Sequence, residues 1–221
     1  MNRFIFTIFI VTLILPIFSA SQVKTVDLLA PMGLKANAAG PLLVRMDAER
    51  NRLVMANTLT SSVSIIDCPS RSVRNIPIGS RVPQYVKSEA LAIDSRTGNA
   101  YVIGNKALEV VFPESGKSRH FPTGKQFEMV AVDESSGNAF LVGRESREMA
   151  FVDLKQNRVR TIPWTDREEI VLNLNQTPPP PIRKVACDQG SGTVLAVDGY
   201  TSTLHAFAAA GGKRLGQRRL G

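Results

Sequence analysis

The sequence predicts an all-β protein made of four repeated units, and three observations support this. A phrase consisting of an apolar residue, an aspartate, several turn-forming residues and a short apolar run occurs four times. Each copy is followed by further strand-like segments that become more polar along the unit. Beyond the first residues, no segment shows the sustained 3.6-residue apolar period of an amphipathic helix. Repetition of strand, tight turn and strand indicates a radial β array.

The first 21 residues are expected to form a secretory signal peptide. Arg3 precedes an uncharged, mostly apolar run at 4–18, and the small residues at 19–21 suit cleavage before Gln22. A membrane-spanning helix needs about 20 apolar residues, and Pro16 interrupts this shorter run. An uncleaved N-terminal anchor is the alternative. In both cases we expect a secreted or periplasmic protein of bacterial type, with no membrane span after signal removal.

The remaining residues, 22–221, are enough for one domain with a core of ordinary size. The net charge of +8 is spread over many turns with few aromatic residues among the cations, so specific nucleic-acid binding is not expected. Weak attraction to anionic cell-surface polymers is consistent with this charge. Cys68 and Cys187 are expected to be separate thiols, because the repeat places their Cα atoms beyond the ~7 Å limit for a disulfide. Cys187, on an innermost strand, is expected to be buried.

The repeat can be read as four strands in each unit. Each aspartate lies between two continuous apolar runs, as expected for strands covered on both faces: 42–46 and 53–56, 90–93 and 100–103, 129–132 and 139–142, and 185–187 and 194–197. Third strands are expected at 62–67, 108–111, 149–153 and 203–207. More polar fourth strands are expected at 73–78, 118–121, 158–162 and 214–220.

Hydrophobicity therefore falls from the first strand to the fourth, which is the gradient of a β-propeller blade. The sequence predicts a β-propeller of four-stranded antiparallel blades, at about 41–79, 86–124, 127–164 and 182–221. An additional strand at 23–29 has the pattern of a fourth strand.

The four repeated aspartates are expected to be structural. A carboxylate at Asp47, Asp94, Asp133 or Asp188 can accept hydrogen bonds from backbone amides two or three residues later. A following Gly or Asn supplies the positive φ that closes the hairpin. A ring of metal carboxylates is the alternative, but one carboxylate per turn is too few for a cation such as calcium, which takes six or more oxygens.

The phrase at 93–102, with the Pro-x-Gly sequence at 122–124, resembles the YVTN-type β-propeller repeat. The unit at 132–153 matches nearly as well, whereas the fourth unit keeps Asp188 and Gly192 but lacks an aspartate at the end of its third strand. The resemblance implies a propeller fold and no single catalytic set. Such propellers serve as binding platforms, as surface proteins and occasionally as enzyme scaffolds.

Four blades are fewer than the six to eight usual for propellers of this kind. Three arrangements remain open: a compact four-bladed ring, part of a longer propeller, or an open arc closed by self-association. The sequence favours part of a longer propeller. An open arc would leave apolar faces and strand edges exposed.

Two long connections, at 80–88 and 165–181, interrupt the regular pattern. Long connections on a rigid scaffold often carry binding sites, although a solvated spacer is the simpler interpretation. His120 and His205 lie in different blades, and no cluster of metal-ligating residues is evident. We therefore expect no catalytic residue, metal or cofactor, and the sequence does not identify ligand-binding residues.

The function expected from these observations is that of a non-enzymatic, exported binding platform for a protein, a polysaccharide or a small ligand. Its partner would be an unidentified protein or a cell-envelope polymer. One alternative is a lactonase-like hydrolase with a central metal, for which Asn57 and Asp198 are the only candidate ligands. The other is a structural piece of a larger envelope protein.

Overall fold

A computed structural model of the protein describes residues 40–143, 148–163, 183–199 and 201–220. Within these residues, sixteen strands form four separate antiparallel sheets of four strands each. The all-β fold class predicted from the sequence is therefore confirmed. The expected signal peptide (1–21), the strand at 23–29 and the connection at 165–181 lie outside the described residues. Among the residues that the structure covers, no helix has the length and hydrophobicity needed to cross a membrane.

Each sheet is a meander whose strands pair in sequence order, and we call it a blade. Blade 1 contains β1 (Pro41–Asp47), β2 (Arg52–Asn57), β3 (Ser62–Asp67) and β4 (Val73–Pro77). Blade 2 contains β5 (Leu91–Ile93), β6 (Ala100–Gly104), β7 (Ala107–Phe112) and β8 (Lys117–Pro122). Blade 3 contains β9 (Met129–Asp133), β10 (Asn138–Val142), β11 (Glu148–Asp153) and β12 (Arg158–Pro163). Blade 4 contains β13 (Arg183–Asp188), β14 (Thr193–Asp198), β15 (Thr203–Ala208) and β16 (Arg214–Arg219).

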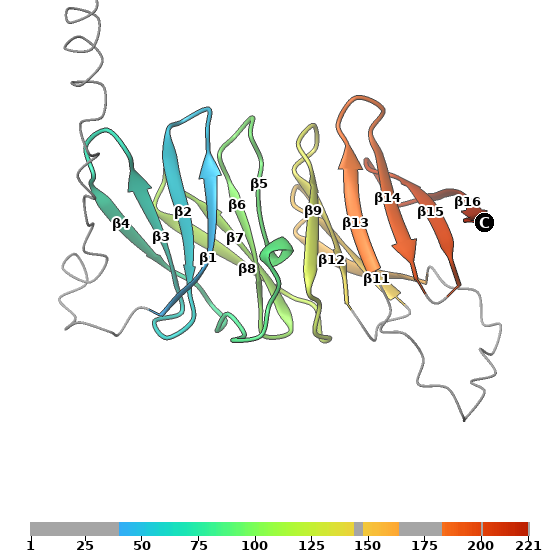
Figure 1. Ribbon diagram of the computed structural model, residues 1–221, viewed down its shortest axis with the longest axis horizontal. Coiled ribbons are helices and arrows are strands. Elements are labelled where there is room, and N and C mark those ends of the chain that lie inside the picture. The colour runs from blue at the N-terminus through green and yellow to red at the C-terminus, as the bar shows by residue number, and fades with distance from the viewer. Residues whose placement is uncertain (1–39, 144–147, 164–182, 200, 221) are drawn as a thin grey trace, which may run out of the picture.

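The blades lie side by side in an open arc (Figure 1). The first strands of neighbouring blades adjoin one another in the order β1, β5, β9 and β13, and these strands form the hub. A short 3₁₀ turn, η3 (Ser88–Ala90), lies at the hub immediately before β5. The fourth strand of each blade is farthest from the hub.

A shared backbone conformation shapes the four hairpins between first and second strands. The fourth residue after each aspartate has a positive φ: Asn51 (48°), Gly98 (73°), Gly137 (77°) and Gly192 (62°). Glycine, and to a lesser degree asparagine, adopts this left-handed conformation at low cost. Each hairpin can therefore reverse within four residues and keep the following strand in the same register.

Blade 3 separates two hydrophobic clusters. Its side chains on one face, among them Val132 and Leu141, pack in a cluster shared with blades 1 and 2. The opposite face, which includes Phe140 and Phe151, packs in a second cluster with Val194 and Phe207 of blade 4. Alternate residues of each strand point to opposite faces of a sheet, so one blade contributes to two cores.

Burial follows the predicted inner-to-outer gradient in blade 2 but not at the ends of the arc. Strands β6 and β7 are almost wholly buried, whereas most of β8 is exposed. In blade 1, by contrast, Leu42, Val44 and Met46 of the first strand are exposed. The sequence pattern predicted the first strand to be the most covered, and this is wrong for β1 because no described blade packs on that face.

The two cysteines are free thiols, as expected. Cys187 is half-buried and not fully buried as predicted, because it lies at the margin of the second hydrophobic cluster, next to the exposed hairpin residue Asp188. Desolvation, followed by the negative charges of Asp133, Asp188 and Glu134, raises the pKa of its thiol to about 11.

Candidate functional site

The turn aspartates cap their own hairpins. Asp94 is buried, and its Oδ1 accepts hydrogen bonds from the amides of Arg96 (3.0 Å) and Thr97 (3.2 Å). The Thr97 hydroxyl donates to Oδ2 at 2.6 Å. Asp133 accepts in the same way from Ser135 and Ser136.

Asp188 accepts from the Ser191 hydroxyl and from the Gly190 amide, and these bonds lower the pKa of its carboxyl. The fourth aspartate is paired differently, because Asp47 receives the Arg52 Nε at 2.8 Å and the Arg50 Nη1 at 3.4 Å. All four carboxylates are thus engaged within the protein.

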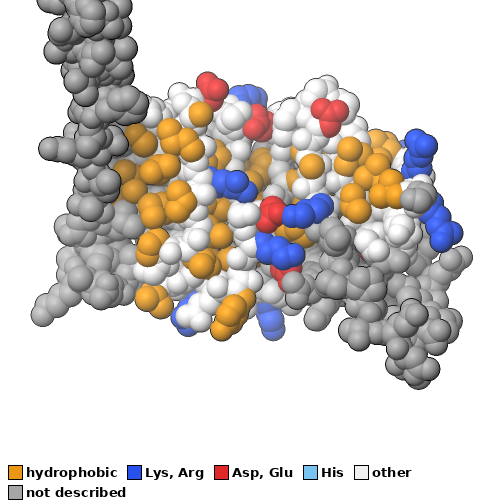
Figure 2. Space-filling model, in the orientation of Figure 1, with side chains coloured by type: hydrophobic (Ala, Val, Ile, Leu, Met, Phe, Trp, Pro, Cys, Tyr) orange, Lys and Arg blue, Asp and Glu red, His pale blue; other side chains and the backbone are white. Residues whose placement is uncertain are grey.

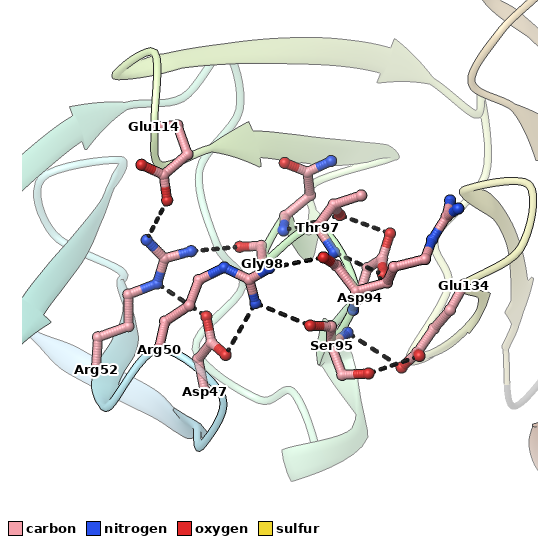
Figure 3. Close-up of polar contacts among 11 residues, drawn as sticks. Asp47, Arg50, Arg52, Asp94, Ser95, Thr97, Gly98, Glu114 and Glu134 are labelled. Carbon is pink, nitrogen blue, oxygen red and sulfur yellow. Dashed lines mark hydrogen bonds and ion pairs between the residues drawn. The ribbon is translucent and has the colours of Figure 1, made fainter.

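Polar contacts join the hairpins of successive blades (Figure 3). The guanidinium of Arg50 donates to the carbonyls of Ser95 (2.8 Å) and Arg96 (2.7 Å) in the blade 2 hairpin. Ser95 in turn donates its hydroxyl to Glu134 of blade 3 at 2.6 Å. Gln189 of blade 4 accepts from the Glu134 amide at 2.9 Å. This rim of the arc is therefore a chain of structural ties.

A cleft of about 560 Å³ lies between blades 1 and 2, and it is lined by Arg50, Arg52, Arg74, Asp67 and Glu114, among others. Its cations already have acceptors in the protein. Arg52 donates to Asp47, to Glu114 (2.8 Å) and to the Gly98 carbonyl (3.2 Å), and Arg74 donates to the Pro113 carbonyl (2.7 Å). The cleft is explained by blade packing without a bound anion.

A buried carboxylate on β7 holds the linker that follows blade 1. Glu109 is fully buried, and its Oε1 lies 2.6 Å from the His120 Nδ1 and accepts from the Ser80 hydroxyl at 2.6 Å. The Gly79 amide donates to Oε2 at 3.2 Å. His120 lies on the outer strand of blade 2 as expected, but its pairing with Glu109 could not be seen in the sequence.

The hub carries a group of charged residues contributed by blades 1 and 4 and by the connections that precede blades 2 and 3. Arg45 of β1 donates to the carbonyls of Leu91 (3.2 Å) and Ser88 (3.1 Å), next to and within η3. Lys184 of β13 pairs with Glu89 of η3. Lys87 lies 3.9 Å from Glu128, which precedes β9. The η3 turn is thus held by polar contacts from blades on both sides.

Tyr85, two residues before Lys87 on the linker between blades 1 and 2, is 95% exposed. We call Tyr85, Arg45, Lys87, Glu89 and Lys184 the hub surface. Figure 2 shows charged side chains gathered in the middle of this face of the arc, with hydrophobic side chains toward both ends.

The two candidate metal ligands of the hydrolase alternative are not brought together. Asn57 is buried in blade 1, where its Nδ2 donates to the hydroxyls of Ser62 (3.1 Å) and Ser64 (2.8 Å). Asp198 is buried in blade 4, at the other end of the arc. Across the described ranges, no group of three or more His, Cys, Asp or Glu residues converges as a metal site would require. His205 is also buried in blade 4, within 3.2 Å of the Arg214 guanidinium.

Comparison with solved structures identifies the architecture. Hydrazine synthase from Kuenenia stuttgartiensis superposes with a TM-score of 0.60 at 15% identity, over 85% of this chain and 51% of that one. The β-propeller domain of Cps50 (Swd1) from Myceliophteria thermophila gives a TM-score of 0.60 at 10% identity, over 85% and 57%. The fold is a β-propeller.

Streptogramin B lyase gives a TM-score of 0.54 at 9% identity, over 85% of this chain and 57% of that one. This propeller chain thus spans between about half and three fifths of the length of these structures. Identities this low establish the fold alone. No family model matches the sequence, and a comparison with curated proteins finds no match.

Sequence reasoning missed the hub surface and the Glu109 cluster for the same reason. Their members lie far apart in the chain and carry no shared motif: Glu89 and Lys184 are 95 positions apart, and Gly79 and Glu109 are 30 apart. The available signals were weak. Glu109 is an acidic residue inside an otherwise apolar strand, and Tyr85 is an aromatic residue inside a polar connection.

Proposed function

We propose that this chain is an exported propeller of the YVTN type that acts as a non-enzymatic binding platform, and that it contacts a protein or polysaccharide through the hub surface. The observation that carries the proposal is the almost complete exposure of Tyr85 on the connection that also carries Lys87 and Glu89, both of which pair with charged residues of other segments. Tyrosine exposes a large, rigid, amphipathic surface and is enriched among the residues that dominate binding energy. Export is supported by the leader-like residues 1–21, and the repeat type by the phrase at 93–102.

A macromolecule fits this surface better than a small ligand does. Small-molecule sites are enclosed and mainly apolar. The larger cleft here is lined by charged side chains that already pair with one another, and the smaller, of about 240 Å³, includes Arg158, Arg160 and Asp153. The hub surface, by contrast, combines an exposed aromatic ring with charges of both signs, a composition suited to an extended partner.

The proposal is tested with the purified chain, screened against a glycan array and against proteins of the cell envelope. Tyr85→Ala should weaken the binding of any ligand found by at least tenfold, because the aromatic contact is lost. Leu59→Ala is the matched control, since Leu59 is also apolar and exposed but lies in the β2–β3 turn. Its affinity should stay within twofold of the unmodified chain.

Binding that Tyr85→Ala leaves unchanged would contradict the role of the hub surface. Catalytic turnover together with stoichiometric calcium or zinc in the purified protein would replace the proposed platform with the hydrolase alternative.

A further inference from the structure

The three joints between blades bury equivalent positions of the repeat. The residue seven positions after each aspartate faces the next blade along the chain. Val54, Tyr101 and Phe140 occupy it in blades 1 to 3, and all three are fully buried. The Tyr101 hydroxyl donates to the Gly137 carbonyl of blade 3 at 2.9 Å, which fixes the direction of this face.

In blade 4 the same position is exposed. Leu195 is 37% exposed, on a face shared with Ala186 and Ala206, its partners on β13 and β15. Val197 and Leu204 are paired next to them and are half-buried. We call Ala186, Leu195, Val197, Leu204 and Ala206 the trailing face.

Blade 1 shows the complementary change. The residue three positions before the aspartate faces the preceding blade: Leu91 is 1% exposed and Val130 is 7% exposed, whereas Val44 is 52% exposed. Met46 lies on the same face and is also exposed, and Met55 and Leu53 are their partners on β2. We call Val44, Met46, Leu53 and Met55 the leading face.

The two faces lie at opposite ends of the arc, where Figure 2 shows hydrophobic side chains over blade 1 and over blade 4. Each face continues an interface that the chain already forms three times. At every internal joint, the face of one blade that corresponds to the trailing face packs against the face of the next blade that corresponds to the leading face. The surface that fits the trailing face of blade 4 is therefore one shaped like the leading face of blade 1. A second copy of the chain supplies that surface.

We propose that two copies of this chain close a ring, with the leading face of each copy packed against the trailing face of the other. Such head-to-tail contacts form a closed assembly when the rotation between copies completes a circle. The described residues of two copies provide eight blades, which is a blade number known for β-propellers, whereas those of three copies would provide twelve. This inference goes beyond the proposed function and does not depend on it.

Light scattering of the purified chain during size-exclusion chromatography should give twice the mass of one chain, which is 24.1 kDa for the full sequence. Val44→Glu and Leu195→Glu should each produce a monomer, because each removes one half of both joints. Tyr85→Arg is the control, since Tyr85 is more exposed than Val44 or Leu195 and belongs to neither face, so the dimer should stay intact. It also separates this test from that of the hub surface.

An equimolar mixture of the Val44→Glu and Leu195→Glu chains should recover a dimer, because one unmodified leading face can still meet one unmodified trailing face. A contact of each face with itself would behave differently, since one of the two single variants would remain dimeric. Circular dichroism and thermal melting of each variant establish that it has folded.

A second measurement needs no substitution. In hydroxyl-radical footprinting of the unmodified chain, oxidation of Met46 should fall several-fold as protein concentration rises, whereas oxidation of Tyr85 should stay constant. A monomer at all concentrations, a series of species larger than a dimer, or Met46 oxidation that is independent of concentration would each overturn the proposal.

Discussion

At the scale of single residues, the repeated aspartate shows how position in the molecule changes the value of one interaction. Asp94 and Asp188 occupy the same place in the repeat and cap the same type of turn. Asp94 is buried under the neighbouring hairpins, whereas Asp188 is exposed. An amide that loses its acceptor costs more where water cannot replace that acceptor.

Asp94→Ala should therefore lower the free energy of unfolding by about 2 kcal/mol, because it leaves the Arg96 and Thr97 amides without their acceptor in a buried turn. Asp188→Ala is the matched control and should cost less, because water can replace the acceptor at this exposed turn. Urea denaturation of both variants measures the difference. Equal losses would show that the cap acts independently of its surroundings.

The sequence identified these turns because their cause is local. The carboxylate, the hydroxyl or amide that it accepts from, and the left-handed residue all lie within five positions, as at Asp94, Thr97 and Gly98. It did not identify the ion pair of Asp47 with Arg52, which replaces the cap in blade 1. The signal was present in the local phrase, because blade 1 has Arg50 where the other copies have the hydroxyl of Thr97, Ser136 or Ser191.

At the scale of structural elements, two buried or hub-facing carboxylates hold connections in place. Glu109 of β7 binds the linker that follows β4 and also contacts His120 of β8. Glu89 of η3 pairs with Lys184 of β13. Sequence reasoning placed all sixteen strands because alternating and continuous apolar runs are local patterns. The contacts of the connections could not be predicted, since they depend on which side chains the finished arc brings together.

Glu109→Ala should destabilise the protein by about 2–3 kcal/mol, because the Ser80 hydroxyl and Gly79 amide lose a buried acceptor. Glu114→Ala is the control. That carboxylate is largely exposed where it pairs with Arg52, so its removal should cost less than about 1 kcal/mol. Chemical denaturation measures both. A small effect of Glu109→Ala would mean that water replaces the carboxylate.

The Glu89–Lys184 contact gives the hub a dependence on pH. The hydrogen bond from Lys184 lowers the pKa of Glu89 from 4.5 to about 2. Because the pKa is lower in the folded state, the contact stabilises the fold above pH 4.5 and loses this effect as the pH falls toward 2.

Lys184→Ala should move the titration of the Glu89 carboxyl back toward pH 4.5, as followed by carbon-13 NMR. Lys125→Ala is the control, because Lys125 pairs with Glu148 and should leave Glu89 unchanged. An unchanged Glu89 titration in the Lys184 variant would show that the pair does not form in solution.

At the scale of the whole molecule, stability is distributed along the arc, because the described strands of each blade pack mainly against those of its neighbours. Blade 4 is joined to the rest through the second cluster, in which Phe140 of blade 3 packs with Phe207 and Val194. The exposed end of the arc at blade 1 could not be predicted from the sequence. The apolar residues of β1 follow the same fall in hydrophobicity from first to fourth strand as those of a blade covered on both sides.

Phe140→Ala should cost about 3–5 kcal/mol and should loosen blade 4 selectively. Hydrogen exchange followed by mass spectrometry should show that the substitution accelerates amide exchange, relative to the unmodified chain, more in β13 to β16 than in β5 to β8. Leu43→Ala provides the comparison, because Leu43 belongs to the first cluster and its loss should act on blades 1 and 2. Uniform acceleration across all four blades would instead indicate a single cooperative unit.

The division of the interior at blade 3 bears on how such a chain could change in length. The two faces of that blade pack in separate hydrophobic clusters. A duplicated or deleted blade therefore adds or removes one joint between blades and leaves the remaining joints unchanged. Gene duplication could thus lengthen the arc without repacking it. The positions under renewed selection would be those at the two tips, where a residue such as Leu195 either gains a neighbour or meets solvent.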